Sequence, residues 1–166
     1  MKRAVSEGHI KPCRVVELGC GSGTNAIFLA SQGFDVTAID VAPTALGIAD
    51  AKARKAGVGV RWLLADVLNL PDLGTFDLIF DRGCYHNVRY ANAAGFVEAV
   101  RQLSHPGSRA LIVSLNRAGP PGVIEQTMRD DFSESFDFVW LKESEIQTGP
   151  DGAQRRPSWS LLLQRT

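Results

Sequence analysis

Apolar and polar residues form short blocks along the chain, and their spacing predicts strands and helices in turn. Runs rich in Val, Ile, Leu and Phe predict buried strands, and apolar residues three and four positions apart predict helices. The expected strands are residues 14–18, 34–39, 60–64, 76–80, 110–115, 136–141 and 159–163. The expected helices run from Thr24 up to Gly33 and over residues 45–56, 93–103 and 124–132. Strands that alternate with helices indicate an α/β sheet with crossover helices.

Individual residues mark the expected ends of these elements. Gly33 and Gly57 stand directly after two helices, where a left-handed residue commonly ends a helix. Pro43 stands in a first helical turn, where proline is tolerated. The polar segment 142–157 contains two glycines and two prolines. This composition predicts a long mobile loop between the last two strands.

The length and charge limit the kinds of protein that the chain can be. With 166 residues, the chain is expected to form one domain, residues 1–166, in which residues 1–12 are a short extension before the first strand. Eighteen basic residues balance 18 acidic ones. Because duplex-binding proteins usually carry a basic excess, nucleic acid is not an expected partner.

Three features that the sequence lacks limit where the protein is expected to act and what it is expected to bind. No apolar run approaches the roughly 20 residues that a membrane span requires, and no secretory signal follows the start, so no membrane association is expected. The three cysteines lack a paired spacing, which predicts reduced thiols in the cytoplasm. His9 and His105 have no partner at a metal-ligand spacing, so no metal site is expected.

A glycine-rich turn follows the first strand and opens the first helix. The strand Arg14–Leu18 leads into Gly19-Cys20-Gly21-Ser22-Gly23, and the helix begins at Thr24. Glycines let the backbone approach a ligand closely, and a helix N-terminus presents free amides. Dinucleotide dehydrogenases share this outline, but their pattern has a third glycine where this chain has Thr24. The turn therefore predicts a nucleotide-like ligand and weakens the case for a nicotinamide cofactor.

Acidic residues lie in or directly after the neighbouring strands. Asp40 ends the second strand, where its carboxylate can accept both hydroxyls of a ribose. Asp66 follows the third strand and can accept the exocyclic amine of an adenine. With Glu17 in the first strand, these acids suit an adenosine ligand without phosphates, because carboxylates disfavour a nearby pyrophosphate. The alternative is that Asp40 and Asp66 only cap the helices that follow.

Four segments, in register along the chain, resemble the motifs of class I S-adenosylmethionine-dependent methyltransferases. They are Val15–Gly23, Val36–Asp40, Ala65–Val67 and Phe76–Asp81. The resemblance implies a Rossmann-like, doubly wound α/β fold, with a mostly parallel sheet of seven strands, an antiparallel last strand and helices on both faces. It also implies S-adenosyl-L-methionine as cofactor, S-adenosyl-L-homocysteine as product and a small-molecule methyl acceptor.

The resemblance also assigns residues to the cofactor. It implies that the methionine part lies along the glycine turn and the backbone after Asp81, that the ribose contacts Asp40 and Val41, and that the adenine contacts Asp66 and Val67. Arg82 pairs with a carboxylate, either of the methionine part or of an acid such as Asp81. The expected cofactor-binding residues are Glu17, Gly19, Cys20, Gly21, Gly23, Asn25, Asp40, Val41, Asp66, Val67, Asp81 and Arg82.

The segment Asp81–His86 resembles that of small-molecule methyltransferases of the thiopurine, thiol or halide, and tellurite-resistance types. The resemblance implies a soft acceptor atom, in a thiol, halide or metalloid, and in-line displacement of the methyl group. His86 is the candidate base because its reference pKa of about 6.5 suits proton transfer near neutrality. Alternatively, it only hydrogen-bonds its loop. Tyr85 is the second catalytic candidate if it lines the acceptor pocket; alternatively, it packs in the core. Cys84 is expected to fill space.

The short start of the chain departs from the family pattern. Members usually carry one or two helices before the first strand, and residues 1–12 are too few for both. We therefore expect an open site, or one closed by another loop or by a second subunit of a homodimer. The alternatives are a fold that binds the cofactor with little or no turnover, or methyl transfer to oxygen or nitrogen.

Overall fold

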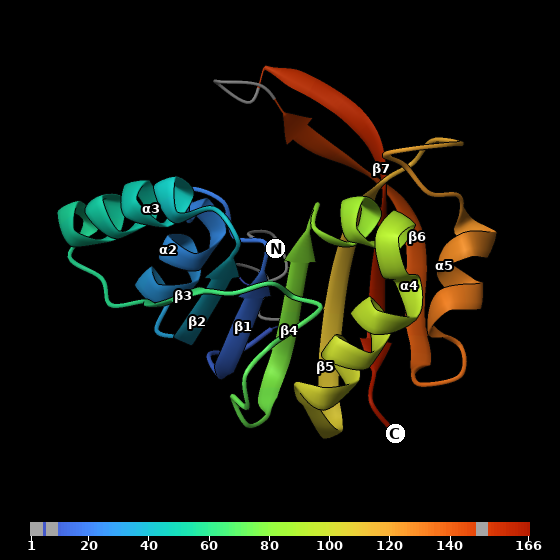
Figure 1. Ribbon diagram of the computed structural model, residues 1–166, viewed down its shortest axis with the longest axis horizontal. Coiled ribbons are helices and arrows are strands. Elements are labelled where there is room, and N and C mark those ends of the chain that lie inside the picture. Colours follow the sequence, from blue (N-terminus) through green and yellow to red (C-terminus); the bar gives the residue numbers. More distant parts are fainter. Residues whose placement is uncertain (1–4, 6–9, 149–152) are drawn as a thin grey trace.

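A seven-stranded sheet organises the part of the chain that the computed structural model describes, which comprises Val5 and residues 10–148 and 153–166. The strand order is β3-β2-β1-β4-β5-β7-β6 (Figure 1). The strands are β1 (Arg14–Leu18), β2 (Asp35–Asp40), β3 (Arg61–Leu64), β4 (Phe76–Arg82), β5 (Ser104–Leu115), β6 (Asp137–Thr148) and β7 (Gln154–Gln164). The helices are α2 (Thr24–Ser31), α3 (Pro43–Ala56), α4 (Tyr85–Gln102) and α5 (Glu125–Phe132).

Strand direction follows the pattern expected from the sequence. Strands β3, β2, β1, β4 and β5 run parallel to one another, whereas β7 pairs antiparallel with both β5 and β6. The expected α/β fold, with a mostly parallel sheet and a reversed last strand, is therefore confirmed.

Helices cover both faces of the sheet, and a hydrophobic core lies under each layer (Figure 1). Because side chains alternate along a strand, Val16 of β1 packs with α4 and α5, while its neighbour Val15 packs with α2. Phe96 and Val100 of α4 are fully buried, as their three- and four-residue spacing predicts. Because the helices cover the two faces of the sheet, the ends of the strands are the places where a ligand can bind.

Helix α4 is longer than the expected helix over residues 93–103. Its backbone leaves helical geometry at Asn92, with φ −161° and ψ 90°. The Asn92 side-chain oxygen accepts a hydrogen bond from the Gly95 amide at 2.8 Å. Asn92 therefore begins the second helical stretch, which is the one that the sequence predicts. The first stretch starts at Tyr85, whose amide donates to the Asp81 carboxylate at 2.9 Å.

The expected loop over residues 142–157 is wrong for most of that segment. Residues 142–148 belong to β6 and residues 154–157 to β7, and the two strands pair from Asp137↔Gln164 to Thr148↔Gln154. Both glycines and one of the two prolines fall within residues 149–152, which lie outside the described residues. The described residues on both sides of this stretch, 142–148 and 154–157, are therefore regular strand and not loop.

The start of the chain is described only in part. Of the expected extension, residues 1–4 and 6–9 lie outside the described residues. Val5 and Ile10 pack against the core on the α2 side of the sheet. Among the described residues, none of the helices has the length and apolar character that a membrane span requires.

Candidate functional site

The carboxyl ends of β1, β2 and β4 meet at one edge of the sheet. Strand β1 lies at the centre and pairs with β2 on one side and β4 on the other. The chain order of the strands reverses at this point, and ligands of open α/β sheets bind in the crevice outside such a switch point. The glycine turn and the acids singled out in the sequence lie here.

Tight packing explains two glycines of the turn that follows β1. Gly19 has φ +63°, and a Cβ atom there would lie 2.6 Å from the Cβ of Cys84. Gly23 has φ +76°, and a Cβ atom there would lie 2.6 Å from the Trp62 ring and 2.8 Å from Ala49. Any side chain at either position is excluded, because both the backbone angle and the space require glycine.

Hydrogen bonds fix the same turn to its surroundings. The Gly21 amide donates to Asp40 Oδ2 at 2.7 Å, and Lys52 Nζ donates to Ser22 Oγ at 2.9 Å. The Cys20 amide donates to the Ile39 carbonyl at 2.9 Å. The Cys20 amide is therefore used within the fold. Cys20 is a buried packing residue, and burial raises the pKa of its thiol to about 12.

Glu17 carries the most distinctive electrostatic feature of the site. Its side chain is only 2% exposed, and its Oε1 accepts a hydrogen bond from Asn25 Nδ2 at 3.0 Å. Its Oε2 is buried without a hydrogen-bond partner. Burial raises the pKa of Glu17 to about 7, although Asn25 and the positive charge of Arg82 oppose the rise. A buried carboxyl oxygen with unused hydrogen-bonding capacity suits a cationic donor from a ligand.

Asp40 has part of its hydrogen-bonding capacity left for a ligand. Oδ2 accepts the Gly21 amide, and Oδ1 accepts the Ala42 amide at 2.9 Å. A carboxylate offers about four acceptor positions, so about two remain for ribose hydroxyls. Asp40 therefore serves the local backbone and still fits the role expected from the sequence. Its neighbour Val41 is 64% exposed.

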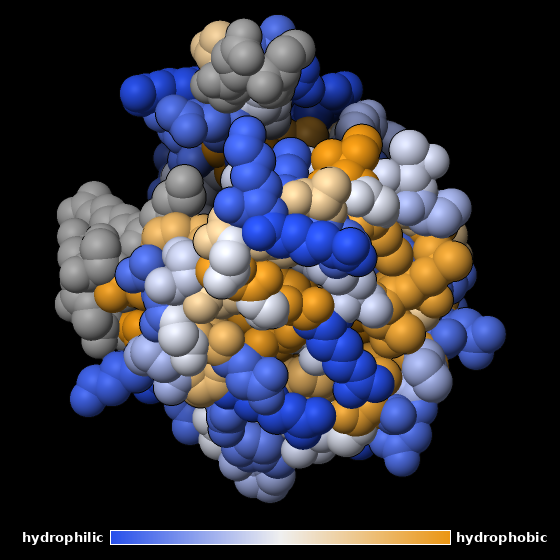
Figure 2. Space-filling view, turned by 90° about the vertical axis from the view of Figure 1, so that its left-hand side faces the viewer, coloured by the Kyte–Doolittle hydropathy of each residue, from blue (hydrophilic) through white to orange (hydrophobic). Residues whose placement is uncertain are grey.

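Asp66 and Val67 follow β3 at the same edge of the sheet. Asp66 is exposed, and its Oδ1 accepts the Leu68 amide at 2.9 Å. Val67 is 5% exposed and packs in the core. Large exposed apolar residues flank this region: Leu64 at the end of β3 and Ile48 of α3. Apolar surface is visible on the side of the molecule that carries these elements (Figure 2), and such surface suits the flat ring of an adenine.

Asp81 and Arg82 both hydrogen-bond to backbone groups near the end of β4. Asp81 is fully buried, and its carboxyl accepts the amides of Gly83 at 3.2 Å and Tyr85 at 2.9 Å. Its side chain therefore fixes the start of α4. Burial raises its pKa to about 8. Arg82 is exposed and donates to the Gln147 carbonyl at 2.5 Å, which ties the β6–β7 hairpin to the end of β4.

The first residues of α4 and the residue before it pack within the protein. Tyr85 is fully buried, its ring packs against Phe96 and Phe132, and its hydroxyl donates to Asp131 Oδ2 at 2.6 Å. The structure thus gives Tyr85 the core position and not the catalytic one. The side chain of Cys84 packs on Gly19, as expected for a residue that fills space, and burial raises the pKa of its thiol.

His86 is 6% exposed and lies beside the end of β5. The Leu115 amide donates to its Nδ1 at 3.4 Å, so the neutral ring carries its proton on Nε2. Burial lowers the pKa of His86, which favours this neutral form. Nε2 is therefore a hydrogen-bond donor, whereas a base would need a free electron pair there.

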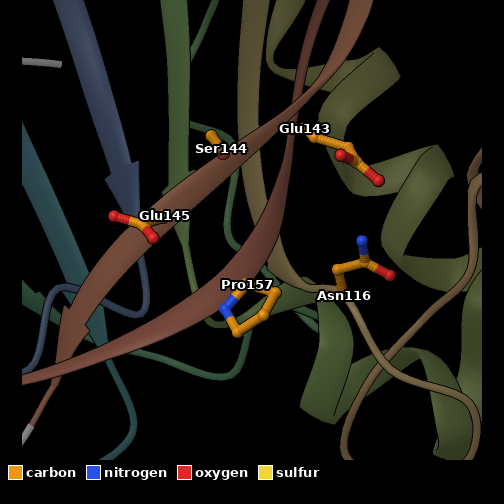
Figure 3. A pocket seen from close by; sticks show the side chains of 5 residues that line it. All are labelled: Asn116, Glu143, Ser144, Glu145 and Pro157. Carbon is orange, nitrogen blue, oxygen red and sulfur yellow. The ribbon is translucent and has the colours of Figure 1, made fainter.

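A cavity that the sequence does not reveal lies between the end of β5 and the β6–β7 hairpin. Its volume is about 500 Å³, within the range of small-molecule sites. The residues that line it are Asn116, Glu143, Ser144, Glu145 and Pro157. Three of them lie on β6 and one on β7, and Asn116 directly follows β5; antiparallel pairing makes these segments neighbours (Figure 3). The only signal in the sequence is Asn116, a polar residue directly after a buried strand.

A search of family models finds a match over residues 15–107, more than half of the chain, to the family described as "Methyltransferase domain". The chain belongs to this methyltransferase domain family. The match confirms the resemblance expected from the sequence motifs, and the dehydrogenase alternative is set aside.

Curated relatives agree with this family. The methyltransferase domain is 26% identical, over 84% of the chain, to 2-heptyl-1-hydroxyquinolin-4(1H)-one methyltransferase of Mycobacteroides abscessus, of which it covers 66%. It is 32% identical, over 68% of the chain, to the ubiquinone biosynthesis O-methyltransferase of Paraburkholderia xenovorans, of which it covers 48%. The chain thus spans about half to two thirds of the length of these relatives.

Solved structures share the fold of the methyltransferase domain. A structure described as "Conversion of a Disulfide Bond into a Thioacetal Group during Echinomycin Biosynthesis" matches with a TM-score of 0.85 at 24% identity, over 98% of this chain and 80% of that one. TehB from Haemophilus influenzae matches with a TM-score of 0.79 at 18% identity, over 100% of this chain and 62% of that one.

Proposed function

We propose that this protein transfers a methyl group from S-adenosylmethionine to a small-molecule acceptor. The observation that carries the proposal is the buried Glu17 oxygen without a partner, at the strand edge where Asp40 and Asp66 also lie. These three carboxyl groups match three different parts of the cofactor. Membership of the methyltransferase domain family supports the same assignment.

Each part of the cofactor has a matching group in the described residues. Glu17 offers its free oxygen to the ammonium of the methionine part, beside the turn that Gly19 opens. Asp40 offers its remaining acceptor positions to the ribose hydroxyls, and Asp66 offers one to the adenine amine. A dinucleotide fits less well, because its pyrophosphate would lie close to several carboxylates.

The chemistry requires alignment more than acid or base catalysis. When bound, S-adenosylmethionine supplies a methyl group on a positively charged sulfur, which leaves as a neutral thioether. The protein's task is to hold the acceptor atom in line with that methyl group at about 3 Å. Arg82 contributes by fixing the hairpin to the end of β4, and Asp81 by fixing the start of α4.

We further propose that the acceptor atom is a soft nucleophile, with a thiol as the first candidate. His86 supports this proposal, because its Nε2 carries a proton and a thiol ionises near neutral pH without a protein base. The curated ubiquinone biosynthesis relative is an O-methyltransferase, so an oxygen acceptor is the second candidate.

Calorimetric titration with S-adenosylmethionine, S-adenosylhomocysteine and NADH tests the cofactor assignment. We expect micromolar binding of both sulfur compounds and none of NADH. Asp40→Ala is expected to weaken binding at least tenfold, because it removes the ribose acceptor. Asp35→Ala, at the exposed opposite end of the same strand, is the matched control and is expected to bind normally. Absence of binding by the unmodified chain would refute the proposal.

A further inference from the structure

The residues around the cavity at the β6–β7 hairpin lie in two rows across the sheet. Strand register places Ser114, Trp159 and Glu143 in one row across β5, β7 and β6. Two residues further along each strand, Pro157 pairs with Glu145, and the Asn116 amide donates to the Pro157 carbonyl at 3.0 Å. Because every second residue of a strand faces the same side, both rows lie on one face of the sheet.

Two polar atoms in the first row have no hydrogen-bond partner. Ser114 is fully buried, and its Oγ has no partner. The Nε1 atom of Trp159, its direct cross-strand neighbour, is also buried without a partner. Buried polar groups in proteins are nearly always satisfied, so two unsatisfied atoms are an unusual feature of the row in which Glu143 lines the cavity.

The charges around the cavity are predominantly negative. Glu143 has no ion-pair or hydrogen-bond partner among the described residues, and it faces the same cavity as the Asn116 carboxamide (Figure 3). Glu145 forms an exposed ion pair with Arg155 at 3.3 Å. Lys142 neighbours Glu143 but stacks on the Trp140 ring, 4.3 Å from its centroid. A free carboxylate at the wall of a cavity attracts cations and disfavours anions.

We propose that this cavity binds the methyl acceptor through a cationic nitrogen group, which Glu143 and Asn116 hold while Glu145 adds to the negative potential. The proposal rests on the proposed methyl transfer, because it takes the cavity beside the β4 and β5 ends as the acceptor side of that site. It narrows the acceptor class by disfavouring halides and metalloid oxyanions. A thiol that carries a neutral or an anionic second group is also disfavoured relative to one that carries an amino group.

Three thiols of similar size and different charge provide the test: cysteamine, 2-mercaptoethanol and 3-mercaptopropionate. Binding of each is measured by saturation-transfer NMR to the protein saturated with S-adenosylhomocysteine, and turnover is measured as S-adenosylhomocysteine formed from S-adenosylmethionine. We expect cysteamine to bind most tightly and 3-mercaptopropionate least. Glu143→Gln is expected to lower the preference for cysteamine over 3-mercaptopropionate about fivefold. Glu134→Gln, an exposed acid at the end of α5, is expected to leave that preference unchanged.

The two proposals fail in different ways. Failure to bind S-adenosylmethionine refutes the proposed function, whatever the thiols do. Cofactor binding combined with an equal or anionic preference, no thiol binding, or a preference that Glu143→Gln leaves intact overturns the cationic-acceptor proposal alone. Cysteamine binding that depends on Glu143 without turnover supports the cavity assignment and places the acceptor atom elsewhere than on sulfur.

Discussion

Glu17→Gln is expected to stabilise the protein without ligand and to weaken its cofactor binding. The pKa of Glu17 rises from 4.5 to about 7 because the side chain is buried. Each pKa unit corresponds to about 1.4 kcal/mol, so the fully ionised group opposes folding by about 3 kcal/mol. Glutamine keeps the shape and the hydrogen bond with Asn25 but carries no charge to desolvate.

The sign of the pH dependence follows from the raised folded-state pKa. The contribution of Glu17 to stability is fully present below pH 4.5, where the group is neutral in both states, and is lost as the pH rises through about 7. The unfolding free energy of Glu17→Gln minus that of the unmodified protein is therefore expected to grow by about 2–3 kcal/mol between pH 5 and pH 8. The charge of Glu17 also raises the pKa of Asp81. Glu17→Gln therefore lowers the pKa of Asp81, which makes its ionisation less costly and adds to the gain in stability at high pH.

Urea unfolding at several pH values measures this difference. Glu134→Gln serves as the control, because it makes the same substitution at an exposed position. In parallel, calorimetry is expected to show that Glu17→Gln weakens S-adenosylmethionine binding about tenfold, through loss of a charge-assisted hydrogen bond. A difference in stability that stays constant from pH 5 to pH 8 would refute the reasoning about Glu17.

Three other predictions concern residues of the site and the residues that support it. Gly23→Ala is expected to lower the free energy of unfolding by about 3 kcal/mol in urea, because the added Cβ would meet the Trp62 ring. Gly21→Ala should lower it by only about 1 kcal/mol, through left-handed strain, because no atom lies within 4 Å of a Cβ there. Equal losses of stability in the two variants would contradict the packing argument. Tyr85→Phe should cost about 1–2 kcal/mol through loss of the bond to Asp131, with cofactor affinity unchanged in calorimetry; weaker cofactor binding would restore Tyr85 to the site. The pH–rate profile should follow the pKa of each thiol acceptor tested, because His86 is neutral with its proton on Nε2; a limb below pH 6.5 that is the same for every acceptor would instead identify His86 as the base.

Local patterns in the sequence predicted most of the fold. The period of apolar residues defined β1 and α2, because each is a short element whose burial depends on its own spacing. The glycine turn and the acids at the ends of β1, β2 and β3 were also predictable, because parallel strands bring their carboxyl ends together. Strands over 136–141 and 159–163 were predicted, but their extension over residues 142–148 and 154–158 was missed, because it is stabilised by pairing between the two strands and not by apolar content.

The cavity could not be predicted for the same reason. Asn116, Glu143 and Pro157 are far apart in the sequence and become neighbours only through strand register. Register between β5, β7 and β6 depends on long-range packing, and a shift of one residue would turn Glu143 to the opposite face. Sequence reasoning therefore predicted the group of residues at the carboxyl ends of the parallel strands and gave no sign of the cavity at the β6–β7 hairpin.

Two buried acidic residues differ in whether their oxygens are used within the fold. Asp81 and Glu17 are both buried at the ends of neighbouring strands, and burial raises the pKa of both. Asp81 accepts two backbone amides, so its oxygens are used within the fold. Glu17 keeps Oε2 without a partner, which costs stability that no contact within the described residues recovers. Under the proposed function, the ammonium of S-adenosylmethionine donates to this oxygen, so the carboxyl group that costs stability in the protein alone is the one that contributes to cofactor binding.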